Sequence, residues 1–143
     1  MIARDPTHQI LKAYYDLLND SIVYDGAVVY VGTRIPDDET KYVHIYIESL
    51  IDNSTGDSVM YKAIVTMQIV SLQDVSEGDE TIMHSIFEQV LEKVGDADAL
   101  IMTDFKCAMV QFEDGDQDSS EMDDTNYIIP NKLRMLNFIE QIK

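Results

Sequence analysis

Residues 41–48, KYVHIYIE, decide the fold class, because apolar and polar or aromatic side chains alternate there with a period of two. One face receives only aliphatic side chains, namely Val43, Ile45 and Ile47. This alternation is typical of a β-strand that buries one of its faces. Residues 53–56, NSTG, have turn-forming chemistry, and residues 59–70 continue as a second long strand. The two strands predict an antiparallel hairpin.

Two amphipathic helices are predicted, one on each side of this hairpin in the sequence. Apolar residues recur at helical spacing over residues 10–18, after an Asp-Pro pair at residues 5–6 of the kind that begins helices. Residues 82–94 form a second apolar stripe, which Gly95 ends. Two residues are candidate N-caps of this second helix: Ser76 and Asp79. A helix with one apolar face has to bury it, so we expect both helices to pack on the sheet.

Three further segments complete the predicted sheet. Residues 22–31 are rich in β-branched and aromatic side chains and predict an edge strand. Residues 105–112 alternate again, and three of them share the expected core face: Phe105, Cys107 and Met109. Residues 127–143 fit a closing strand or a short helix, and we favour the strand. The order of elements predicts one α+β domain over residues 1–143, with an antiparallel sheet of four to five strands and two helices packed on one face.

The net charge of −17 limits the classes of partner. It results from 27 acidic and 10 basic residues, and it argues against nucleic acid held by its phosphates, or anionic lipid, as the main partner. No apolar run approaches the roughly 20 residues that cross a bilayer, and the first residues lack an apolar signal core. With a single cysteine, no intrachain disulfide can form. We therefore expect a soluble protein made in a reducing cytoplasm.

Two polar segments are expected to project as loops. Residues 32–40 contain Pro36 and three consecutive acids, and residues 113–126 hold 7 of the 27 acidic residues. Because such segments have few apolar side chains to bury, we expect them to remain in solvent. Nine carboxylates of the two loops are candidate functional residues: Asp37, Asp38, Glu39, Asp114, Asp116, Asp118, Glu121, Asp123 and Asp124.

The sequence contains no constellation that would define an enzyme or a metal site. The three histidines lie in different predicted elements: His8, His44 and His84. Residues 114–118 suggest a calcium loop, but the sixth position is Ser119 instead of glycine and the twelfth is Thr125 instead of glutamate. Cys107 lies on an expected core face without an activating motif. We therefore predict a non-enzymatic protein with no cofactor and no metal.

The outward face of the predicted hairpin is more apolar and aromatic than a solvated sheet face needs. The side chains concerned are Tyr42, Tyr46, Met60, Ile64 and Val70. Either helices of the same chain cover this face or another subunit does, and the sequence leaves both alternatives open.

The order of elements resembles the tail-completion or tail-terminator family of tailed bacteriophages, small head-tail joining proteins that form rings. The resemblance covers nearly the whole chain, in the helix 10–20, VYDGAV at 23–28, KYVHI at 41–45, the strand 61–71, the helix 81–94 and KLRMLNF at 132–138. It implies a homo-oligomeric ring, a hexamer or dodecamer, located in the virion between the portal or its adaptors and the tail. Genome DNA would pass through the ring without specific binding, and no membrane would be involved. Before assembly the subunits would be in the host cytoplasm.

A closed ring needs two different, complementary patches on each subunit. We expect the edge near residues 22–31 and the final strand to supply them, with candidate interface residues Tyr24, Val28, Tyr30, Tyr42, Tyr46, Leu133 and Met135. The acidic loops would then point to the lumen or to the neighbouring ring, where carboxylates repel DNA phosphates.

A second hypothesis belongs to another functional class. The charge also suits an acidic regulatory or inhibitor protein that mimics nucleic acid. Such a mimic needs carboxylates spread over one folded face, whereas a quarter of the acids here are concentrated in residues 113–126. A binding module for another ligand is the remaining alternative.

Overall fold

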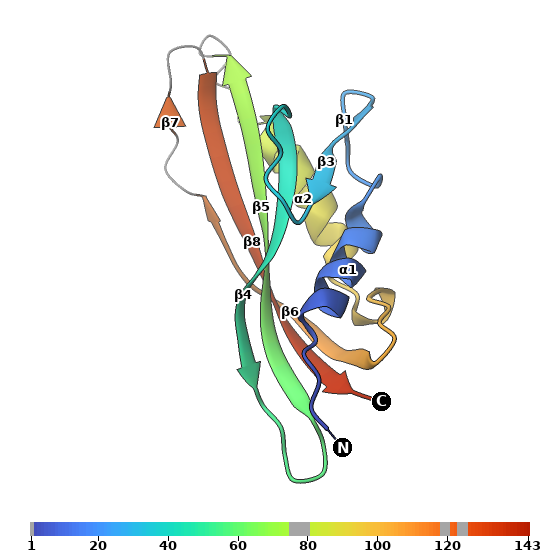
Figure 1. Cartoon of the computed structure of the whole chain (residues 1–143). Coiled ribbons are helices and arrows are strands. Elements are labelled where there is room, and N and C mark those ends of the chain that lie inside the picture. The colour runs from blue at the N-terminus through green and yellow to red at the C-terminus, as the bar shows by residue number, and fades with distance from the viewer. Residues whose placement is uncertain (1, 75–80, 118–120, 123–125) are drawn as a thin grey trace.

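The computed structural model describes residues 2–74, 81–117, 121–122 and 126–143, and within them the chain has the predicted α+β fold. The elements in chain order are α1 (Thr7–Leu18), β1 (Val23–Tyr24), β2 (Ala27–Val28), β3 (Tyr30–Gly32), β4 (Lys41–Asp52), β5 (Met60–Asp74), α2 (Thr81–Val94), the 3-10 helix η1 (Ala97–Ala99), β6 (Phe105–Gln117), β7 (Glu121–Met122) and β8 (Asn126–Gln141) (Figure 1).

The main sheet has the strand order β3-β4-β5-β8-β6, and β7 pairs with β8 near the start of that strand. The pairs β4–β5, β5–β8 and β8–β6 are antiparallel, whereas β3 runs parallel to β4. The sheet is therefore mixed, and our prediction of an antiparallel sheet was wrong at this edge. A strand of three residues spans only about 10 Å, so the connection 33–40 is long enough to return along it and enter β4 in the same direction.

The predicted edge strand over residues 22–31 is divided. Asp25 and Gly26 have φ angles of 52° and 78°, which make a tight turn between β1 and β2, as in hairpins with an Asp-Gly loop. The amide side chain of Gln89 on α2 holds this small hairpin by accepting from the Val23 backbone N–H at 2.9 Å and donating to the Val23 carbonyl at 2.8 Å. Only β3 belongs to the main sheet.

Both helices lie on the same face of the sheet, as predicted (Figure 1). α1 packs on β4 and α2 on β5 and β8. At the start of α1 the carboxylate of Asp5 accepts from the Thr7 hydroxyl at 2.6 Å and from the Thr7 backbone N–H at 2.9 Å, although Pro6 occupies the N-cap position itself. These two hydrogen bonds lower the pKa of Asp5. The candidate caps of α2, Ser76 and Asp79, lie outside the described residues.

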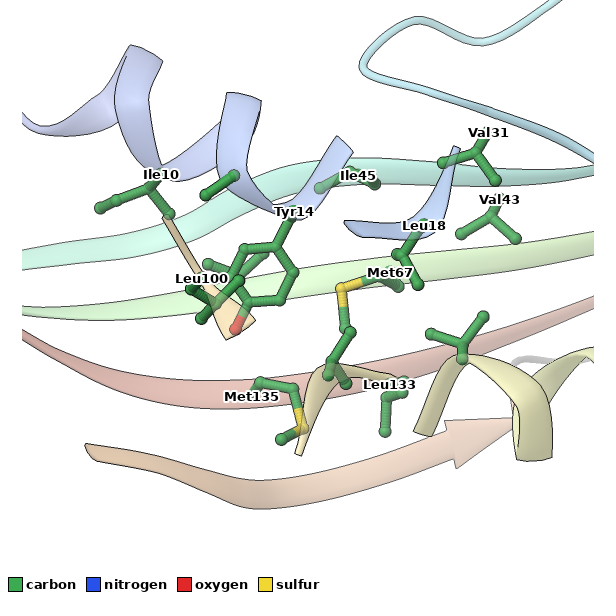
Figure 2. Close-up of a cluster of buried hydrophobic side chains, with 14 of the residues drawn as sticks. Ile10, Tyr14, Leu18, Val31, Val43, Ile45, Met67, Leu100, Leu133 and Met135 are labelled. Carbon is green, nitrogen blue, oxygen red and sulfur yellow. The ribbon is translucent and has the colours of Figure 1, made fainter. Parts of the chain in front are cut away.

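The core lies between the helices and this face of the sheet (Figure 2). The predicted alternation of β4 and β5 is confirmed, because most of their inward side chains are fully buried and Ile47 is partly buried against them. The fully buried ones are Val43, Ile45, Ala63, Val65, Met67 and Ile69. From the helices, Tyr14, Leu18 and Val90 pack against them. Burial of each large aliphatic side chain contributes roughly 1.5–3 kcal/mol, so this layer supplies the main stabilisation of the fold.

β8 is the predicted closing strand, but it is not at an edge. It pairs with β5 on one side and with β6 on the other. Leu133 and Met135 point to the helices and are 0% and 1% exposed. Their assignment to a subunit interface was therefore wrong. Among the described residues, the last strand on this side of the sheet is β6, with the short β7 beside the start of β8.

β6 departs from the predicted pattern in two ways. A bulge between Cys107 and Met109 reverses the alternation, so Met109 leaves the core face and is 43% exposed. The strand also continues to Gln117, where a loop was expected. Strand pairing satisfies backbone groups whatever the side chains are, so polarity alone did not exclude a strand here. The predicted loop at 113–126 was wrong for the residues of β6 and β7.

Candidate functional site: the open face of the sheet

The face of the sheet opposite the helices is the candidate functional site, and we call it the open face. Within the described residues no helix covers it (Figure 1). Of the two alternatives that the sequence left open, coverage of this face by helices of the same chain is therefore not seen in the described part of the chain. The cross-strand register assigns these side chains to the open face: Tyr42, His44, Tyr46, Lys62, Ile64, Gln68, Lys132, Arg134, Leu136, Phe138, Met109 and Asp114.

Two adjacent rows across the open face are mainly apolar. They consist of Ile51, Lys62, Phe138 and Met109 in the first row and Ser49, Ile64, Leu136 and Gln111 in the second. Ile51 is 57% exposed. The ammonium group of Lys62 lies 5.6 Å from the centroid of the Phe138 ring. The basic residue of the first row therefore adds its aliphatic stem and a cation–π contact to the row. These rows form an apolar patch that four strands share.

A charged row follows the apolar rows. Arg134 of β8 donates from Nε to Glu48 of β4 at 2.9 Å and from a terminal guanidinium nitrogen to Asp114 of β6 at 2.9 Å. The two ion pairs raise the pKa of Arg134, so its charge is fixed. A bulge between Ile47 and Ser49 aims Glu48 across β5 toward this arginine. Thr66, between them in the register, is fully buried.

The part of the open face formed by the first half of β4 is aromatic. Tyr42 and Tyr46 are half-buried there, and burial raises the pKa of Tyr42. The rings of His44 and Tyr46 lie 5.2 Å apart. Half-buried Tyr side chains offer a large apolar surface together with a hydroxyl, a combination that is common in protein interfaces.

The remaining predicted interface residues do not join the open face. Tyr24 and Val28 are in the β1–β2 hairpin, where Val28 is 57% exposed and the Tyr24 ring has the Lys41 ammonium 5.7 Å from its centroid. Tyr30 is half-buried in the edge strand β3. These three side chains surround the β3 edge, so the structure separates the predicted interface into an edge and a face.

Leu136, Phe138 and Met109 belong to the site, but the sequence analysis did not select them. Both faces of β8 have enough apolar side chains to be interpreted as the core face. The period of two in the sequence does not indicate which of the two faces is buried. A signal was present, because Lys132 and Arg134 share the open face with Leu136 and Phe138, whereas positions 133, 135, 137 and 139 have no charge.

The predicted acidic residues are divided among several elements. Asp37, Asp38 and Glu39 are exposed in the connection between β3 and β4, as expected. Asp114 is paired with Arg134 in β6. Asp116 and Glu121 are strand residues of β6 and β7, so they are not loop positions. Three further candidates lie outside the described residues: Asp118, Asp123 and Asp124.

The chemistry available in the described residues is limited. No group of three or more His, Cys, Asp or Glu side chains there is arranged to hold a metal ion. Cys107 is 3% exposed, its Sγ donates to the Met109 carbonyl at 3.4 Å, and burial raises the pKa of its thiol to about 11. A thiol that stays protonated at neutral pH is a poor nucleophile. In the same ranges no helix is long and apolar enough to span a membrane.

Comparison of the sequence with models of known protein families and with curated proteins gave no match.

Proposed function

We propose that this chain is a structural subunit of a homo-oligomeric ring, and that the open face and the free edges of the sheet make the contacts between subunits. The open face supports this proposal most directly, because four strands share an apolar patch that no described helix covers. Apolar side chains gathered in one patch on a soluble domain are typical of interaction sites.

The edges of the sheet support the same proposal. β6 has a partner strand on one side only among the described residues, so its other side presents backbone N–H and C=O groups. β3 pairs with only three residues of β4, which leaves the remainder of β4 without a described partner on that side. Open edges of this kind accept strands or side chains of another subunit.

The setting we propose is the head-tail junction of a tailed bacteriophage, as the resemblance of the sequence implies. A net charge of −17 suits a ring through which DNA passes, because carboxylates repel phosphates and DNA does not adhere. Asp37, Asp38 and Glu39 are candidates to face the DNA, since the connection that contains them is exposed.

Mass measurement by light scattering and sedimentation, over a range of protein and salt concentrations, tests the assembly. Negative-stain images of any large species would show whether it is a closed ring. We expect a ring for the wild-type chain and its loss in Met109→Lys, which places a charge in the apolar patch. Ile101→Lys is the matched control, because Ile101 is 78% exposed and lies outside the strands of the sheet.

A wild-type chain that remains monomeric under all these conditions contradicts the ring. Binding to a basic protein, with the monomer as the active species, would instead favour an acidic mimic. A ring that forms equally well in Met109→Lys retains the assembly but excludes the open face as its interface.

A further inference from the structure

A groove of about 500 Å³ lies at the β3 edge of the sheet, between α1 and the residues that follow β3. Its lining includes Leu11, Tyr15 and Tyr30 as apolar walls and His8, Lys12 and Arg34 as basic groups. Leu11 and Tyr15 are half-buried against the core, so their positions are fixed by the fold.

The shape of the groove depends on Gly32. A Cβ atom at this position would lie 2.7 Å from the Tyr30 hydroxyl oxygen, which shows that the Tyr30 side chain folds back over the glycine. The absence of a side chain at residue 32 therefore lets the Tyr30 ring form part of the lining. The groove is built from side chains of α1, of β3 and of the residues that directly follow β3.

The charge of the groove differs from that of the chain as a whole. Lys12 pairs with Asp16 at 2.6 Å, but among the described residues no carboxylate pairs with Arg34. Two cations and one anion line this groove, whereas the chain has 27 acidic and 10 basic residues. The groove therefore favours an occupant that combines an apolar side chain with a carboxylate.

The opposite edge of the sheet presents such a combination. On β6 the ring of Phe112 is 52% exposed, and Glu113 follows it in a bulge with its side chain in solvent. Glu113 has no ion-pair partner among the described residues, in contrast to Asp114, which Arg134 engages. β3 and β6 are the two ends of the strand order, so this pair and the groove are on opposite edges.

We propose that the groove of one copy receives Phe112 and Glu113 from β6 of the next copy. The Phe112 ring packs on Leu11 and Tyr15, and the Glu113 carboxylate accepts hydrogen bonds from the Arg34 guanidinium. Contacts between two different edges are heterologous, which is the type of interface that closes a ring. This proposal rests on the ring proposed above and specifies how its neighbours meet.

A charge exchange tests the contact in the full-length chain. We expect Arg34→Glu alone and Glu113→Arg alone each to weaken assembly about tenfold or more in the apparent dissociation constant, because like charges then meet in the groove. The double variant restores assembly. Lys93→Glu is the matched control, since it makes the same charge change at an exposed position of α2 outside the groove, and it should assemble like the wild type.

Cross-linking gives a second measurement that does not depend on affinity. A chain with both Arg34→Cys and Glu113→Cys should form a ladder of covalent oligomers on mild oxidation, and a chain with Lys93→Cys and Glu113→Cys should not. A ring that tolerates Arg34→Glu overturns this contact and leaves the ring intact. The same conclusion follows if the charge-exchange double variant stays impaired and the Arg34→Cys, Glu113→Cys chain gives no ladder while the wild type assembles. A wild-type chain that never assembles overturns both.

Discussion

The two faces of the sheet use the same four long strands in opposite ways. On the face toward the helices, most side chains of β4, β5 and β8 are buried and apolar, and Asn137 is one of the buried polar exceptions. On the open face, the side chains of the same strands are mixed in chemistry and most are half-buried or exposed, although Thr66 and Val70 are buried. An apolar patch lies there beside a charged row. The comparison indicates that one face maintains the fold of the subunit and that the other is available for a partner.

The largest expected effect on the free energy of unfolding comes from replacing leucine by alanine in β8, and it should differ between the two faces of this strand. Leu133 and Leu136 both lie in β8, but Leu133 is fully buried and Leu136 is half-buried. We expect Leu133→Ala to lower the free energy of unfolding by about 2–5 kcal/mol, because it leaves a cavity in the core. Leu136→Ala should cost about 1 kcal/mol or less and should instead weaken assembly.

Chemical denaturation at a protein concentration that keeps the chain monomeric measures both variants. Equal losses of stability in the two variants would contradict the division of roles between the faces.

An intermediate effect is expected at the buried polar group of the helix face. The Tyr14 hydroxyl donates to Asn137 Oδ1 at 2.6 Å, and Asn137 Nδ2 donates to the Met135 and Ala63 carbonyls at 3.0 and 3.3 Å. Tyr14→Phe removes this hydroxyl donor and leaves the Asn137 oxygen near the Cys107 thiol at 3.9 Å, whose one proton is shared with the closer Met109 carbonyl at 3.4 Å. We expect a loss of about 1–2 kcal/mol at neutral pH.

The same variant makes a pH-dependent prediction. Burial, which outweighs the Asn137 hydrogen bond, raises the pKa of Tyr14 above its ordinary value. The folded state therefore keeps the phenol proton more tightly than the unfolded state, and the stability that this group contributes is complete below pH ~10 and is lost as the pH rises further. Denaturation curves measured above pH 10 should show that the difference in the free energy of unfolding between the wild type and Tyr14→Phe becomes smaller. A constant difference between them would argue against this assignment.

The smallest expected effect concerns the charged row of the open face. Arg134→Met removes both ion pairs while it retains an unbranched side chain over Thr66. Because the two carboxylates are exposed, solvent screens these pairs, and we expect a loss of about 1 kcal/mol that diminishes at high salt. Lys106→Met, at an exposed position of β6 with no described ion pair, is the control. A loss above about 3 kcal/mol would show that the charged row is part of the core.

The sequence analysis succeeded where side chains on one face of an element differ from those on the other. The two helices and the hairpin were predicted because their apolar residues have a clear period. Residues 127–143 fitted either a strand or a short helix, and the strand that we favoured is β8. It failed at β6, because two bulges change the alternation by one residue and no local signal marks a bulge. It also failed in choosing Leu133 and Met135 for an interface, because a period of two cannot distinguish the two apolar faces of β8.

The sequence by itself determined the two helices, the long hairpin, their amphipathic faces and the charge, since these depend on residues that are close along the chain. Only the tertiary structure decided that β8 is inside the sheet, that β6 is an edge, and that Arg134 joins Glu48 and Asp114 across the open face. Strand order results from pairing between residues far apart in the sequence, which a local pattern does not encode. For this reason the structure leads us to assign the candidate interface to β6 and the open face instead of the final strand.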